Sequence, residues 1–127
     1  DLTSGIVNWE NKITSVSAPI IINNKIFIVS KNGYFAILDQ KSGDIVSSTN
    51  ILKVLKKKHQ QTEVSGFIMG SGKIYSVTSN GYLIISNASS GKVESYKKIG
   101  NNINSTPVIS NGKLYILTED SKIVVYN

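Results

Sequence analysis

Self-similarity between three stretches of the chain constrains its fold more than any other feature. Residues 17–27 align without a gap with residues 105–115, and residues 65–75 fall on the same frame. Further along, the Asn-Gly-Tyr sequence at 32–34 returns at 80–82. A repeat of a few tens of residues indicates an array of similar structural units. Every later prediction therefore starts from this repeat.

Each copy is predicted to contain short strands joined by tight turns. In the first copy the expected strands are 18–22, 25–30, 34–38 and 44–48. Asn/Gly linkers such as Asn23-Asn24 suit tight hairpins because both residues tolerate positive φ. One such sheet cannot bury both of its faces, whereas stacked neighbours can. The predicted fold class is all-β, with about three four-stranded antiparallel blades of a β-propeller that belong to a larger ring.

The repeat also divides the chain. The predicted parts are an outer strand of a preceding blade at 1–9, a blade at 17–48, a second at 65–96 and a third, lacking its outer strand, at 105–127. The segment 49–64 lengthens one repeat, and its apolar residues fall near helical spacing. It is expected to be an inter-blade insertion with about one or two helical turns.

Turn residues recur at fixed places in the repeat. An Asp or Asn side chain can accept a hydrogen bond from the backbone two residues on, and glycine supplies positive φ. The predicted structural repeat motif consists of Asp1, Gly5, Trp9, Gly33, Asp39, Gly43, Gly81, Asn87, Gly91 and Gly112. These residues are expected to shape turns and not to catalyse a reaction.

The sequence predicts no catalytic, cofactor-binding or metal-binding residues, and no cofactor. It contains no cysteine and a single histidine, His59, in a lysine-rich segment. A metal site needs several ligands, so His59 is interpreted as a solvated loop residue. The glycines are explained by turns, which leaves no phosphate-binding loop.

The net charge of +6 comes from lysine alone, since all 14 basic residues are Lys. Without the planar fork of arginine, specific nucleic-acid recognition is not expected. The run Lys56-Lys57-Lys58 is a candidate for weak contact with acidic surfaces, against the simpler interpretation of a solvated loop. The first residues lack the features of a signal peptide, and the repeat phase favours a targeting segment further upstream.

The element formed by Asp1, Ser4, Gly5, Val7 and Trp9 resembles the PQQ-like repeat of quinoprotein dehydrogenases and of the BamB-type outer-membrane β-barrel assembly lipoprotein. Residues 17–39 look like blades of that lipoprotein, and residues 106–127 are similar to its C-terminal blade. The resemblance covers nearly all of the chain except residues 49–64. Family members have about eight blades, which implies a fragment.

One departure from the family concerns the tryptophan that docks one blade on the next. It is present only as Trp9, and Ser47 and Ser95 stand at the matching positions. Other side chains are therefore expected to pack between the blades, and Tyr96 is the candidate.

The resemblance implies a non-enzymatic, protein-binding scaffold of the bacterial cell envelope, on the periplasmic side of the outer membrane. Its partner would be a protein of an envelope complex, bound by shape or by strand addition. Two alternatives stay open: a fragment of a PQQ-dependent dehydrogenase, whose calcium ligands cannot be placed here, and a ligand-sensing extracellular propeller domain. The repeat phase also predicts a strand-exchanged dimer, in which residues 5–9 supply the outer strand that the last repeat lacks.

Overall fold

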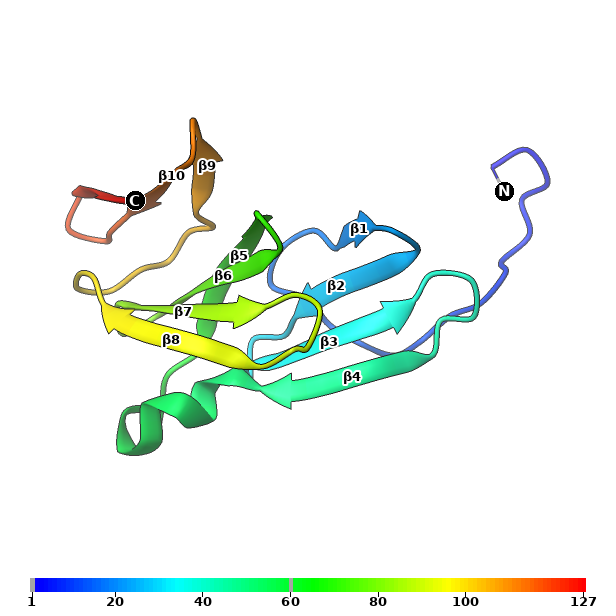
Figure 1. Cartoon of the computed structure of the whole chain (residues 1–127), viewed down its shortest axis with the longest axis horizontal. Coiled ribbons are helices and arrows are strands. Elements are labelled where there is room, and N and C mark those ends of the chain that lie inside the picture. The colour runs from blue at the N-terminus through cyan, green and yellow to red at the C-terminus, as the bar shows by residue number, and fades with distance from the viewer. Residues whose placement is uncertain (1, 60) are drawn as a thin grey trace.

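The computed structural model describes residues 2–59 and 61–127, and its strands form three antiparallel sheets (Figure 1). The first sheet contains β1 (Ile20–Ile22), β2 (Lys25–Val29), β3 (Tyr34–Asp39) and β4 (Ile45–Asn50). The second contains β5 (Val64–Gly70), β6 (Lys73–Thr78), β7 (Tyr82–Asn87) and β8 (Val93–Lys98). The third contains β9 (Val108–Ser110), β10 (Lys113–Leu117) and β11 (Ile123–Tyr126). The all-β prediction is confirmed.

Within each sheet the strands follow chain order, so each strand pairs with the next one along the chain. The first hairpin turns at Asn23 and Asn24, with φ of 52° and 64°. The equivalent turns of the other sheets use a Ser-Gly and an Asn-Gly pair, also with positive φ at both residues. Two consecutive positive φ values match the right-handed twist of the flanking strands. The repeated Asn and Gly residues thus fix the strand pairing locally.

The innermost strands of the three sheets begin close together. The Ser17 hydroxyl, just before β1, lies 3.0 Å from the Thr106 hydroxyl, just before β9. It also accepts a hydrogen bond of 3.3 Å from the backbone N–H of Phe67 in β5. The sheets therefore radiate from a common inner side (Figure 1), and they do not close into a ring.

Apolar side chains fill the two spaces between neighbouring sheets. The larger core joins the first sheet, the second sheet and the connection between them, and its buried residues include Phe27, Phe35, Ile37, Ile51, Leu52, Leu55, Phe67, Ile74 and Ile84. The second core joins the second and third sheets through Val77, Leu83, Ile85, Ile103, Leu114 and Ile116. Each sheet thus buries its apolar face against a neighbour, as the repeat predicts.

The segment between the first two sheets forms η1 (Ile51–His59), a 3₁₀ helix interrupted at Lys56, where φ is 56°. Helical turns are present where the sequence predicts them. Ile51, Leu52 and Leu55 point into the larger core. Figure 1 shows η1 below the first two sheets, at one end of β4. The side chains of Lys57, Lys58 and His59 lie outside the described residues, as does Asp1.

The division of the chain into blades remains a prediction. For residues 2–9, within the segment 1–9 predicted to be an outer strand, the structure gives no strand. Residues 2–5 form a turn, and residues 6–9 are not paired in a strand within the described chain. A strand needs a neighbour to satisfy its backbone groups. The sheet to which this segment would belong is not supplied by the described residues.

Gly33 and Gly81 occupy equivalent turns, with φ of 92° and 90°. Their carbonyl oxygens accept hydrogen bonds from the backbone N–H groups of Ile51 (2.8 Å) and Ile99 (2.9 Å), which follow the outer strands. A Cβ atom on Gly81 would lie 2.2 Å from the carbonyl oxygens of Gly100 and Asn101. Because both neighbours are backbone atoms, they cannot move aside as a side chain would.

We expect Gly81→Ala to lower the free energy of unfolding by about 2 kcal/mol more than Gly72→Ala. Gly72 is the matched control because its φ is also positive, at 73°, but nothing lies within 4 Å of a Cβ atom there. The Gly72→Ala variant therefore loses stability only through conformational strain, by about 1–2 kcal/mol. Urea unfolding of both variants measures the difference. Equal losses would show that the close approach to the backbone has no energetic weight.

Candidate functional site

The repeated Asp and Asn residues shape the turns before the outer strands. Asp39 Oδ1 accepts hydrogen bonds from the backbone N–H groups of Lys41 (2.9 Å) and Ser42 (3.1 Å). Asn87 Oδ1 accepts the same pair of bonds in the second sheet, at 2.9 and 3.0 Å. The backbone bond from Ser42, followed by that from Lys41, lowers the pKa of Asp39 below its ordinary value. The structure therefore places both residues in turns.

The remaining motif glycines lie at turns as well. Gly5, Gly43, Gly91 and Gly112 all have positive φ. Gly43 and Gly91 face a neighbouring unit, whereas nothing lies within 4 Å of a Cβ atom on Gly5 or Gly112. Gly43 and Gly91 are therefore packed against other residues of the chain, whereas Gly5 and Gly112 are open.

Trp9 packs on the turn of the first sheet. A Cβ atom on Gly43 would lie 2.3 Å from Cε3 of the indole, so only glycine allows this approach. The indole Nε1 donates a hydrogen bond of 2.7 Å to the carbonyl oxygen of Gln40. In the next unit the same relation holds between Ser47 and Gly91, since a Cβ atom on Gly91 would lie 2.9 Å from Ser47 Oγ. The repeat position occupied by Trp9 and Ser47 is thus the docking position between consecutive units, and Ser95 stands at the same position in the second sheet.

Where serine replaces tryptophan at the docking position, a cleft lies between the sheets. Ser47 lines a cleft of about 630 Å³ between the first and second sheets, with Phe27, Ile37 and Met69 in its walls. Ser95 lines a cleft of about 320 Å³ between the second and third sheets. The walls of the second cleft include the equivalent residues Tyr75, Ile85 and Ile109. A serine side chain is too short to fill the space that an indole covers.

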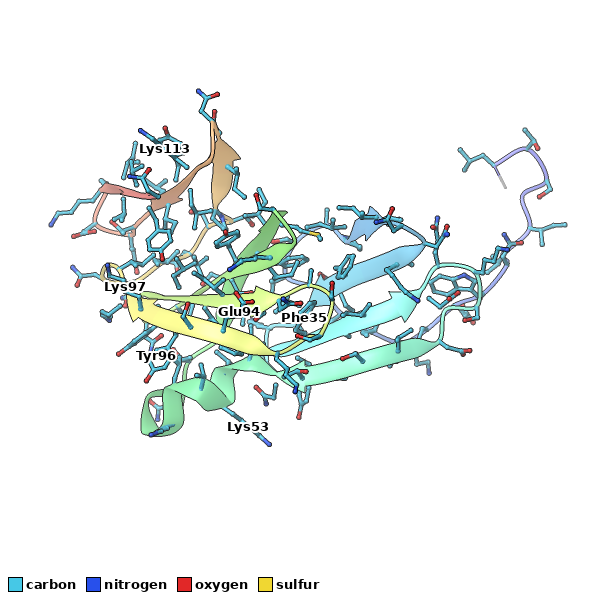
Figure 2. The ribbon with its side chains drawn as sticks, viewed as in Figure 1. Phe35, Lys53, Glu94, Tyr96, Lys97 and Lys113 are labelled. Carbon is cyan, nitrogen blue, oxygen red and sulfur yellow. The ribbon has the colours of Figure 1, made fainter. Side chains whose placement is uncertain are left out.

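Tyr96 does not take the place of the tryptophan at the docking position. Its side chain is 46% exposed. Its ring lies 6.3 Å from that of Tyr82 on the adjacent strand of the same sheet. Figure 2 shows Tyr96 on β8, away from Phe35 in the larger core. Because successive side chains of a strand alternate between faces, Tyr96 cannot take over the role of its neighbour Ser95.

Lysines line both clefts. Lys25, beside the first cleft, is 3.8 Å from the Asp39 carboxylate. Lys73, beside the second, donates a hydrogen bond of 2.7 Å to Glu94. The lysine bond, together with a weaker one from the Asn87 amide, lowers the pKa of Glu94, and Glu94 in turn raises the pKa of Lys73. Each cleft therefore combines apolar walls with a lysine that is paired with an acidic side chain of its own sheet, and the apolar walls suit an apolar side chain.

Within residues 2–59 and 61–127, no group of three or more His, Cys, Asp and Glu side chains is placed to hold a metal ion. In the same part of the chain, no helix is long and apolar enough to cross a membrane. The two clefts were not predicted from the sequence. The signal that could have indicated them is serine, at residues 47 and 95, in the repeat position that Trp9 occupies.

The radiating sheets, the repeated turns and the docking position define a β-propeller built from PQQ-like repeats. Residues 53–127 match the family described as outer membrane protein assembly factor BamB. The chain belongs to this family. A comparison with curated protein sequences finds no significant match.

Solved structures support the same fold. BamB from Moraxella catarrhalis superposes with a TM-score of 0.70 at 13% identity, over 97% of this chain and 40% of that protein. The quinohemoprotein alcohol dehydrogenase ADHIIG from Pseudomonas putida HK5 gives a TM-score of 0.64 at 17% identity, over 77% of this chain and 16% of the enzyme. The Cps50 (Swd1) β-propeller domain from Myceliophteria thermophila gives 0.65 at 13% identity, over 82% of this chain and 34% of that domain. At these identities the likeness concerns the fold, and the chain spans less than half the length of each structure.

We expect Ser47→Trp to raise the free energy of unfolding by about 1–2 kcal/mol, because the indole would cover Gly91 as Trp9 covers Gly43 and would bury apolar surface in the cleft. Ser48→Trp is the matched control, since its side chain points to the opposite, exposed side of β4. Urea unfolding of the two variants measures the effect. A Ser47→Trp protein no more stable than the Ser48→Trp protein would contradict the assignment of the docking position.

We expect the stabilising effect of Glu94 to depend on pH. Its pKa in the folded chain is lowered from 4.5, so its contribution is fully present above about pH 4.5 and is lost as the pH falls through the folded value. Unfolding of the wild type and Glu94→Gln, followed between pH 7 and pH 3, measures this. The gap between the two proteins should close as the pH falls. A constant gap would contradict the ion pair with Lys73.

Proposed function

We propose that the chain is a non-enzymatic, protein-binding scaffold of the bacterial cell envelope that acts in outer-membrane protein assembly on the periplasmic side of the outer membrane. Membership of the BamB family is the observation that carries this proposal. The superposition on BamB from Moraxella catarrhalis over 97% of the chain supports it. The partner is another protein of an envelope complex.

The proposed mechanism is static recognition by preformed surfaces. Two buried cores hold the sheets together, so the clefts between them need little rearrangement to accept a partner. The cleft at Ser47 is the larger, and Lys25 lies in its wall. A partner segment that inserts an apolar side chain between Phe27, Ile37 and Met69 would fit this cleft. The run Lys56-Lys57-Lys58 adds a weak attraction to acidic surfaces in this proposal.

The test is made in the bacterium that carries the gene. Cells without the protein should contain less folded β-barrel protein in the outer membrane, measured by heat-modifiable migration on gels, and the wild-type gene should restore it. Unchanged barrel protein in the deleted strain would overturn the proposal.

The role of the cleft is tested in the same strain with Ser47→Trp, whose indole fills the space at Ser47. This variant should accumulate normally and yet fail to restore the barrel proteins. Ser48→Trp, which leaves the cleft open, should restore them. Full restoration by Ser47→Trp would remove the cleft from the mechanism.

A second candidate function is supported by the likeness to a quinohemoprotein alcohol dehydrogenase, at a TM-score of 0.64. In this alternative the chain is part of a PQQ-dependent enzyme. Titration of the protein with PQQ and calcium, followed by the absorbance of the quinone, distinguishes the two. We expect no saturable binding, and saturable binding would favour the dehydrogenase.

A further inference from the structure

The turn that Trp9 covers in the first sheet is repeated in the second sheet. Gly43 and Gly91 both have a φ of 76°. The backbone N–H of Gly43 donates to the carbonyl oxygen of Asp39 at 2.8 Å, and that of Gly91 donates to the carbonyl oxygen of Asn87 at 2.9 Å. The side-chain bonds of Asp39 and Asn87 match as well. The two turns therefore offer nearly the same backbone surface to whatever packs on them.

The second turn contains a hydrogen-bond acceptor that the chain leaves unused. In the first turn, the carbonyl oxygen of Gln40 accepts the bond of 2.7 Å from the Trp9 indole. Ala88 stands at the place of Gln40 in the second turn. It is only 5% exposed and lines the cleft at Ser47, and no donor of the described chain is bonded to its carbonyl oxygen. A donor that enters the cleft would satisfy this oxygen.

The space beside this acceptor is apolar and preformed. Phe27, Ile37 and Ser47 pair across β2, β3 and β4, and they form one row that ends at the serine. Met69, from the second sheet, also lines the cleft, and a thioether makes favourable contacts with aromatic rings. The cleft volume of about 630 Å³ is typical of a ligand pocket. Its lining residues all belong to the two four-stranded sheets and their turns.

We propose that the cleft at Ser47 binds a tryptophan side chain of a partner protein, whose indole takes over the docking position that serine leaves open. The ring would lie on the turn at Gly91, and its Nε1–H would donate to the Ala88 carbonyl oxygen. Trp9 on Gly43 identifies this occupant, because it shows an indole seated on the equivalent turn with the equivalent bond. The inference rests on the proposed protein-binding function and adds which side chain of the partner is bound.

Other side chains do not satisfy both parts of the site. Phenylalanine or leucine would fill the apolar space but would leave the Ala88 carbonyl oxygen without a donor. Lysine or arginine would supply a donor, but its charge would lie among apolar walls and beside Lys25. The tyrosine hydroxyl adds an acceptor that the apolar walls leave unsatisfied. Tryptophan combines a large apolar ring with one N–H donor and no acceptor.

The first test uses Met69, the single methionine of the chain, as a probe in the cleft wall. A ¹³C label on its methyl group gives one NMR signal. Free indole, which stands for the tryptophan side chain, should shift this signal in a saturable manner. 1-Methylindole has the same ring system without the N–H donor, so it should bind about fivefold more weakly. No saturable shift, or equal affinity for the two compounds, would overturn the proposal.

The second test blocks the site from within the chain. Ser47→Trp should abolish the shift that indole causes, because its own indole occupies the docking position. Ser48→Trp is the matched control, since it places the same residue on the exposed side of β4, and it should bind indole as the wild type does. Circular dichroism checks that both variants are folded. Unchanged indole binding by Ser47→Trp would contradict the assigned site.

The third test presents the side chain within a peptide. A Gly-Trp-Gly peptide should compete with indole for the cleft, whereas Gly-Phe-Gly should compete much more weakly because it lacks the N–H donor. Equal competition by the two peptides would show that the cleft accepts any apolar ring and would overturn the assignment to tryptophan.

These measurements use the purified protein, so their outcome is separate from that of the deletion strain. Absence of indole binding, together with a loss of barrel proteins in the deletion strain, would remove the tryptophan site and keep the scaffold. Indole binding with unchanged barrel proteins would keep the site and remove the role in outer-membrane protein assembly.

Discussion

The packing of each sheet's apolar face against its neighbour is the interaction on which the structure depends. The two larger cores each lie between two sheets, and Phe27 and Phe35 of the first sheet are buried in one core with Phe67 and Ile74 of the second. The two docking contacts, Trp9 on Gly43 and Ser47 on Gly91, add close packing beside these cores. A β-propeller is the consequence, because a row of such sheets must curve around its inner strands.

The sheets could be predicted from the sequence because their signals are local. The Asn23-Asn24 hairpin and the Asp39 turn are determined by residues within each turn, and the structure has a strand on either side of both. Packing between sheets depends instead on which side chains meet across a distance. Tyr96 was a plausible replacement for tryptophan by composition, but strand alternation turns it to the other face, next to Tyr82. The clefts at Ser47 and Ser95 could not be predicted for the same reason, since their walls come from two sheets.

One repeat position thus takes two forms in a single chain. Trp9 fills the space above Gly43, whereas Ser47 and Ser95 leave clefts lined by lysine and apolar side chains. The exchange of a large residue for a small one at a docking position weakens packing and creates a binding surface at the same place. Stability and recognition are therefore coupled, and Ser47→Trp shifts the balance towards stability.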